Sequence, residues 1–319
     1  MIFVLRYAIM YISLQTALKY SWFSDPMEVE DLVEMTGMGV VASLAEVYPQ
    51  LYLRLGDTEQ YADVVRRGMI PEVRDVSHFQ TDVLDEASVG VTSAGSVQIV
   101  QLTHRADFEL FYQLMGFKCV PTAIPPQTGA VILDGVINWT KIRAHQAEFL
   151  SEKPDGNWSE EFQKFTSVKS NYLDALILLS SGNYSSVPAE QFGYSQEEWL
   201  RISYEIRKAH ELTHFLCRRK YPEQKNAVWD ELVADAVGIV SALGRFDPAM
   251  ESVFLGVSPN GYIGGRLETY TETPEMLTPR ICSVLQEFEK LYHANTVTDP
   301  FVFAELLESG QASLWGESS

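Results

Sequence analysis

Lys208-Ala-His-Glu-Leu-Thr-His-Phe215 is the stretch that decides the fold expected for this chain. It places two histidines four residues apart with Glu211 directly after the first, which is the H-E-x-x-H pattern of zinc hydrolases. On an α-helix, positions four apart lie one above the other, so His210 and His214 can bind one ion from the same face. Glu211 lies about 100° further round the helix, where it can reach a water molecule on that ion.

The residues around this motif predict a long amphipathic helix from Ser195 to Lys220. Ser195 and Glu198 have the spacing of a capping box, and Pro222 stops the helix. One face carries apolar or motif residues three or four positions apart, namely Trp199, Ile202, Ile206, His210, Thr213, His214 and Cys217. The opposite face is expected in water, with Glu205, Arg207, Lys208 and Arg218. The histidines therefore face the core, where a metal ion would be a partner for both imidazoles.

A second helix is predicted to begin at Asn226, which caps it, and to end near Gly244. Glu231 and Asp235 are four residues apart on its otherwise apolar face, where two carboxylates would be costly to bury without compensation. Glu231 can be the third metal ligand, since a His₂Glu set leaves one position of a zinc ion open. Asp235 can accept the ring N–H of His210 and fix its tautomer.

These residues resemble the signature of the gluzincin branch of zinc metallopeptidases, the thermolysin-like group with H-E-x-x-H on one helix and E-x-x-x-D on the next. The matching positions are His210, Glu211, His214, Glu231 and Asp235, within residues 195–243. The resemblance implies a zincin-like fold, a bound zinc ion (Zn2+) and a peptide or protein substrate. The first helix also looks like that of an uncharacterised microbial family with a similar His-Glu-x-Thr-His helix, which implies a fold and no particular substrate.

Two features depart from the gluzincin pattern. The sixteen residues 215–230 between His214 and Glu231 are a short separation for this branch, and Lys208 stands where such peptidases usually keep an uncharged residue. In the alternative without a metal, these are solvated polar helices whose carboxylates pair with Arg218 or Arg219. The apolar neighbours of Glu231 argue against that alternative.

Length and composition bound the class of protein. The chain has 319 residues, of which 46% are hydrophobic and 12% aromatic, enough for a folded protein with a sizeable core. The net charge of −19, from 43 acidic and 24 basic residues, argues against nucleic acid and anionic membranes as partners. The three cysteines lack C-x-x-C spacing, so a reducing compartment, the cytoplasm, is expected. Residues 1–18 predict a packed amphipathic helix rather than a signal peptide.

The expected fold class is α+β, with a small sheet packed on a mostly helical C-terminal half that carries the two motif helices. Prolines at 121, 125 and 126 suggest a division into an N-terminal α/β region of unknown role, residues 1–122, and a zincin-like metal-binding domain, residues 123–319. The alternative is one continuous domain.

Local patterns predict the remaining elements. Strands are expected over residues 51–55, 96–102, 130–133 and 175–179, and helices over 25–34, 57–67, 105–114, 140–150, 248–255, 279–293 and 300–308, with a frayed tail from Gly310. By the gluzincin resemblance, residues 175–181 would border the cleft and pair with a substrate backbone. The alternative is an interior strand.

Residues 261–270 form a glycine-rich loop with Gly261, Gly264 and Gly265. Such a loop either turns the chain or approaches something closely. Zinc hydrolases need a hydrogen-bond donor to the oxyanion besides the metal, and Tyr262, Arg266 and Tyr270 are the candidates. The alternative is a surface turn with structural tyrosines.

The function expected from the sequence is a zinc-dependent hydrolase, a metallopeptidase in which Glu211 is the general base. One alternative is a non-catalytic binding module that keeps the zincin fold and its metal. The other is an acidic interaction protein without a metal.

Overall fold

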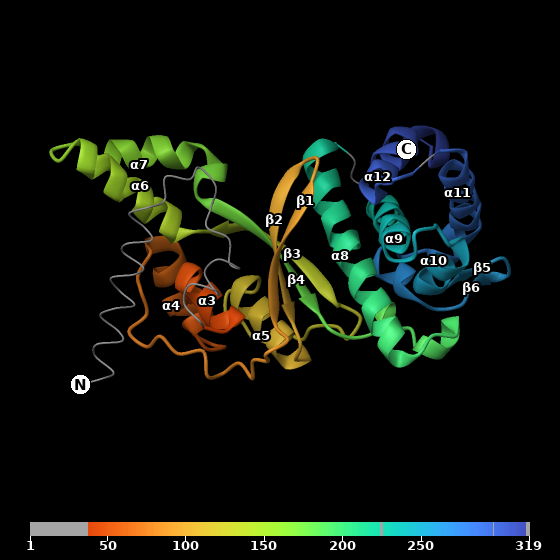
Figure 1. Cartoon of the computed structure of the whole chain (residues 1–319), viewed down its shortest axis with the longest axis horizontal. Coiled ribbons are helices and arrows are strands. Elements are labelled where there is room, and N and C mark those ends of the chain that lie inside the picture. The colour runs from red at the N-terminus through yellow and green to blue at the C-terminus, as the bar shows by residue number, and fades with distance from the viewer. Residues whose placement is uncertain (1–37, 224–225, 296, 317–319) are drawn as a thin grey trace. The chain divides into compact units, whose positions relative to one another are not determined.

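The computed structural model describes residues 38–223, 226–295 and 297–316 (Figure 1). The helices expected over residues 1–18 and 25–34 lie outside these described residues. The chain forms two compact units, and together they are an α+β protein. Of the described residues, the first unit holds 38–89, 98–123 and 133–178, and the second holds the rest.

The first unit is built mainly from short helices. They are α3 (Val40–Val47), the 3₁₀ turn η1 (Pro49–Tyr52), α4 (Thr58–Tyr61), which continues as the π turn η2 (Ala62–Arg66), α5 (Arg105–Met115), α6 (Trp139–Glu152) and α7 (Trp158–Ser167). The Asp174 carboxylate connects the junction of α3 and η1 to the start of α6, because it accepts hydrogen bonds from Tyr48 Oη at 2.7 Å, from Asn138 Nδ2 at 2.7 Å and from Lys141 Nζ.

A four-stranded sheet contributes residues to both units. Its strands are β1 (Glu86–Thr92), β2 (Gly95–Leu102), β3 (Ala130–Ile137) and β4 (Leu173–Ser180), in the order β1-β2-β4-β3. Because β4 pairs with a strand on each side, its edges are not available to a substrate backbone. The interior-strand expectation for residues 175–179 is confirmed, and the substrate-side alternative is wrong.

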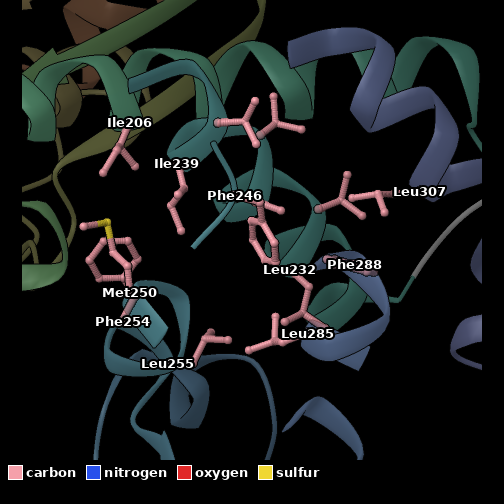
Figure 2. Packing of buried hydrophobic residues seen from close by; sticks show 14 of the residues in the cluster. Ile206, Leu232, Ile239, Phe246, Met250, Phe254, Leu255, Leu285, Phe288 and Leu307 are labelled. Atoms are coloured by element: carbon pink, nitrogen blue, oxygen red, sulfur yellow. The ribbon is translucent and has the colours of Figure 1, made fainter. Parts of the chain in front are cut away.

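The second unit is mainly helical. It contains the short turns η4 (Tyr184–Ser186) and η5 (Ala189–Phe192), α8 (Gln196–Lys220), α9 (Ala227–Leu243), α10 (Pro248–Leu255), the β5–β6 hairpin (Val257–Ser258 and Gly261–Tyr262), η6 (Arg266–Thr269), α11 (Pro274–Ala294) and α12 (Pro300–Leu314). Figure 2 shows the apolar side chains that gather between these helices, among them Ile206, Leu232 and Phe288. Each such side chain stabilises the fold by about 1.5–3 kcal/mol when fully buried.

The ends of α8 and α9 follow the predicted caps. Ser195 and Glu198 form the capping box, with Glu198 N donating to Ser195 Oγ at 3.3 Å and Ser195 N donating to Glu198 Oε2 at 2.9 Å. Asn226 Oδ1 accepts a hydrogen bond from Trp229 N at 3.0 Å, and Gly244 ends α9 with a left-handed φ of 67°. Both helices are continuous over the predicted ranges.

Gly238 sets how closely α9 approaches α8. A Cβ at this position would lie 2.8 Å from the backbone oxygen of Ile206, closer than real Cβ atoms come. Since the obstacle is backbone, it cannot move aside as a side-chain tip would. A larger residue at position 238 must therefore separate the two helices.

Several elements differ from the sequence-based expectation. Residues 51–55 do not form a strand: Pro49 opens a 3₁₀ turn there and Leu51 is fully buried. Strand β1 and helix α7 were not expected. Helix α12 continues past Gly310 because Trp315, stacked under the Arg280 guanidinium at 4.5 Å, is buried and anchors the end. The expected domain boundary between residues 122 and 123 also differs from the division into two units, because residues 133–178 belong to the first unit.

No helix within the described ranges combines the length and the apolar character that crossing a membrane requires.

Replacing Gly238 with alanine should lower the free energy of unfolding by about 1–3 kcal/mol, the usual effect of overpacking, although alanine is the better helix former. Thermal and denaturant unfolding of the purified variant measure this change. Gly310→Ala is the matched control, since a Cβ there meets only the Leu314 side chain, at 3.2 Å. A Gly238→Ala protein as stable as the Gly310→Ala protein would contradict the close approach.

Candidate metal centre

The two histidines of α8 and Glu231 of α9 form a compact cluster of donor atoms. His210 Nε2 and His214 Nε2 are 3.0 Å apart. Glu231 Oε1 lies 3.4 Å from His214 Nε2, and Glu231 Oε2 lies 3.5 Å from His210 Nε2. The ligands of a tetrahedral zinc ion are separated by about 3.3 Å when each bond is about 2.05 Å. The three side chains therefore fit a zinc ion in both chemistry and spacing.

The opposite edges of both imidazole rings face carboxylates. His210 Nδ1 is 2.9 Å from Asp235 Oδ1, the contact expected from the spacing, and His214 Nδ1 is 3.1 Å from Asp230 Oδ2. A hydrogen bond to Asp235 stabilises a proton on His210 Nδ1. The nearby Asp230 charge stabilises a proton on His214 Nδ1, although the geometry of this contact is not that of a hydrogen bond. The two Nε2 lone pairs then point at one another. Two lone pairs at this distance repel unless a cation lies between them. Glu231 Oε2 is likewise buried with no hydrogen-bond partner among the described residues.

In the metal-free cluster a proton can act as that cation. Burial lowers the pKa of His214, but the carboxylates of Asp230 and Glu231 raise it more, so this pKa lies well above its usual value. Burial raises the pKa of Glu231, but His214, His210 and Arg266 together hold it well below its usual range. Glu231 therefore stays ionised, and its negative charge favours a cation between the His210 and His214 rings.

Tyr184 is a member of the site that the sequence did not indicate. Its hydroxyl donates to Asp235 Oδ1 at 2.6 Å and lies 2.9 Å from His210 Nδ1. It accepts a hydrogen bond from Arg266 Nη1 at 2.9 Å, and Arg266 Nη2 pairs with Asp235 Oδ2. Burial raises the pKa of Tyr184 well above its usual value, so the phenol keeps its proton. Tyr184 and Arg266 thus hold Asp235 against His210.

Residues of α8 fix the segment that presents Tyr184. Tyr184 N donates to Ser203 Oγ at 2.9 Å, and Arg207 Nη1 donates to the Ser180 carbonyl at 2.9 Å. Ser185 and Ser186 have left-handed φ angles of 49° and 58°, an unfavourable conformation for serine that the surroundings must hold. The expectation of a solvated Arg207 is wrong: the side chain is buried, and it also donates to the carbonyls of Gly182 and Asn183.

The glycine-rich loop brings two of its three candidate donors to the cluster. Arg266 is buried and paired with Asp235. Tyr270 lies beside the cluster: burial raises its pKa, Arg266 lowers it, and the nearby Glu231 charge raises it further. Tyr262 does not reach the cluster, because its hydroxyl donates to the Gly265 carbonyl at 2.8 Å and to Glu268 Oε2 at 3.1 Å.

The backbone of this glycine-rich loop packs against the backbone at the end of α10. A Cβ on Gly265 would lie 2.5 Å from Gly256 N, and Ile263 N donates to the Gly256 carbonyl at 2.8 Å. Gly256 has a left-handed φ of 74°. The backbone contact places Arg266 where it can reach Asp235, so the close-approach expectation is confirmed.

Glu211 differs from every other carboxylate of the site. It is only 8% exposed, yet it forms no hydrogen bond or ion pair with another described residue. It follows His210 directly on α8 and lies off the face that carries the two imidazoles. Its oxygens are thus free to bind water.

Glu251 lies behind this network on α10. It is fully buried, and neither of its oxygens has a hydrogen-bond partner among the described residues. Burial raises the pKa of Glu251 well above its usual value, and the charge of Asp235 raises it further. Its protonated form is therefore favoured.

Among the described residues, His210, His214 and Glu231 are the one group of three or more potential ligands close enough to share a metal ion. The structure thus defines an α+β protein with a buried His–His–Glu cluster between two packed helices. The chain belongs to a family of unknown function (DUF7005), which matches residues 30–299. Comparisons with curated proteins and with solved structures gave no match.

Replacing Asp235 with asparagine should weaken zinc binding by about 10–100-fold, because the charge that orients His210 is lost while the shape is kept. Competition with a chelator of known affinity measures the change. Asp247→Asn is the control: Asp247 caps α10, a position that asparagine fills equally well. Equal zinc affinity in Asp235→Asn and wild type would rule out this role.

Zinc binding should weaken as the pH falls, because His214 must lose a proton to bind the ion and its pKa is raised. We expect about ten-fold per pH unit below that pKa in chelator competition. The stability of the metal-free protein should follow the opposite trend. The raised pKa of His214 stabilises the folded protein at a pH below that pKa, and this stabilisation is lost as the pH rises through the pKa. Melting curves in EDTA measure the second trend. Zinc affinity independent of pH would contradict the assignment of His214.

Proposed function

We propose that this protein is a zinc-dependent hydrolase that cleaves peptide bonds. The observation that carries the proposal is the unpaired Glu211 carboxylate beside the His210, His214 and Glu231 cluster. A structural zinc site is normally closed by a fourth protein ligand and has no use for such a carboxylate. A hydrolytic site needs one as a general base.

The residues divide the work as follows. His210, His214 and Glu231 would hold the zinc ion, and Asp235 and Asp230 keep the two rings in the tautomer that presents Nε2. A zinc ion held there supplies Lewis acidity, which polarises a carbonyl group and makes water a stronger acid. Glu211 accepts the proton of the attacking water and passes it to the leaving amine.

Of the three loop residues, Tyr270 is the best placed to donate to the oxyanion. It lies beside Glu231, and its raised pKa keeps the phenol protonated. The Arg266 guanidinium is already paired with Asp235, so its function is to position that carboxylate. The Tyr262 hydroxyl is hydrogen-bonded within its own loop, so Tyr262 is not proposed as an oxyanion donor.

The motif spacing and the contact between Asp235 and His210 support membership of the gluzincin group with a zincin-like fold, and the sparse cysteines support a cytoplasmic location. The substrate would be a peptide or a protein. Lys208 stays clear of the cluster, since its Nζ lies over the Tyr204 ring at 5.7 Å. The lysine therefore does not obstruct the proposed chemistry.

Replacing Glu211 with glutamine should separate catalysis from metal binding. No ligand is lost, so zinc content and melting temperature should remain near those of the wild type. Peptide hydrolysis should fall by about 10²–10⁴-fold, the usual contribution of a positioned general base. A peptide-library digest followed by mass spectrometry measures activity, and elemental analysis measures zinc.

Glu205→Gln on the same helix is the matched control and should keep full activity. Equal cleavage by Glu211→Gln and wild type would remove Glu211 from the mechanism. If zinc-loaded wild type cleaved nothing in a broad library, the non-catalytic binding module would be the better description. Protein that takes up no zinc would support an interaction protein without a metal.

A further inference from the structure

A polar pocket is lined in part by Asp230, the residue whose Oδ2 lies 3.1 Å from His214 Nδ1. It has a volume of about 190 Å³ and lies between the end of α8, the start of α9 and α12. An engineered cavity of about 150 Å³ holds a benzene molecule, so this pocket has room for a small organic ligand. Its lining includes Cys217, Arg218, Tyr221, Trp229, Asp230 and Glu308.

Glu308 is the feature of this pocket that calls for a ligand. Its side chain is buried, with 4% of the residue exposed, and Oε2 has no hydrogen-bond partner among the described residues. Burial and the nearby charge of Asp230 together raise the pKa of Glu308 to about 7. Trp229 and Cys217 lie beside this carboxyl and lower its pKa, but Oε2 itself has no partner among the described residues. A buried carboxyl oxygen without a partner is destabilising, and a cation bound beside Oε2 would remove that penalty.

The rest of the lining fits an organic cation better than other ligands. Asp230 adds a second carboxylate, which disfavours anions, while Tyr221 and Trp229 contribute aromatic rings that attract cations. A metal ion fits less well. Among the described residues, the ligand atoms of Cys217, Asp230 and Glu308 do not form a group close enough together to share one ion. The arginine of the lining, Arg218, is exposed, so its charge is largely screened by water.

We propose that this pocket binds a primary ammonium group on a short carbon chain, with Glu308 as its counter-charge and Asp230 as a second acceptor. Asp230 also connects the pocket to the metal cluster, since its Oδ2 is 3.1 Å from His214 Nδ1. An ammonium beside Asp230 reduces the negative charge that supports His214 and adds positive charge near the zinc ion. Amine and zinc should therefore weaken one another's binding by the same factor. This coupling rests on the proposed zinc site, whereas amine binding does not.

The probe for the pocket is n-butylammonium, with n-butanol and butyrate as uncharged and anionic controls of similar size. The indole N–H signal of Trp229, assigned through Trp229→Phe, reports binding to metal-free protein by NMR. We expect a saturable shift with butylammonium and little with the controls. Equal shifts with butanol and butylammonium would overturn the assignment of a cation site.

Glu308→Gln keeps the size of the side chain and removes its charge, so butylammonium should bind at least about ten-fold more weakly, the loss of a charge-assisted hydrogen bond. Glu272→Gln, the same change on an exposed residue, should bind as the wild type does. Unchanged binding by Glu308→Gln would also overturn the proposal.

Repeating the titration with zinc-loaded protein tests the coupling. We expect the dissociation constant of butylammonium to rise by at least about five-fold, the lower end for coupled sites. The same dissociation constant with and without bound zinc would overturn the coupling, while the proposal of an amine site would still stand. If the protein took up no zinc, the proposed hydrolase would fail, while the metal-free titration would still decide the amine site.

Discussion

The buried charge of Asp235 is the constraint on which the second unit depends. Burial raises the pKa of this fully buried carboxyl, but Arg266 and His210 lower it more, so the group stays ionised. A buried anion is tolerated only when it is paired and hydrogen-bonded. The partners come from three other places in the chain: His210 on α8, Tyr184 before it and Arg266 after the β5–β6 hairpin. Each of these segments is fixed in turn, by Ser203 and Arg207 on one side and by the Gly256–Gly265 contact on the other.

The metal helices could be predicted from the sequence because their signals are local. The capping box at Ser195, the cap at Asn226 and the four-residue spacings of His210–His214 and Glu231–Asp235 each fix a helix or a face within a few turns. Helix α10 was predicted to the residue, over 248–255. The α+β class and the interior position of residues 175–179 followed from the same kind of pattern.

The features that were missed depend on contacts between distant segments. Tyr184 lies in a serine-rich turn with no periodic pattern, and only the fold brings its hydroxyl to Asp235. Arg207 was expected in water because it lies opposite the apolar stripe of α8, yet it donates to the carbonyls of Ser180, Gly182 and Asn183. Helix α12 was expected to fray at Gly310, but the burial of Trp315 holds its end. Helix α7 does carry a local signal, the Asn157 cap that accepts hydrogen bonds from Ser159 N and Glu160 N.

The glycine contacts have a consequence for how the family can be recognised. Gly238, Gly256 and Gly265 carry no chemistry of their own, but each is in a place where a methyl group would collide with backbone. Related chains that share this arrangement of helix and loop should be intolerant of change at these three positions as well as at the histidines. A sequence search that combines the H-E-x-x-H motif with the spacing of these glycines would select for the scaffold as well as for the metal ligands. Such a search would separate true relatives from the many helices that carry the short motif by chance.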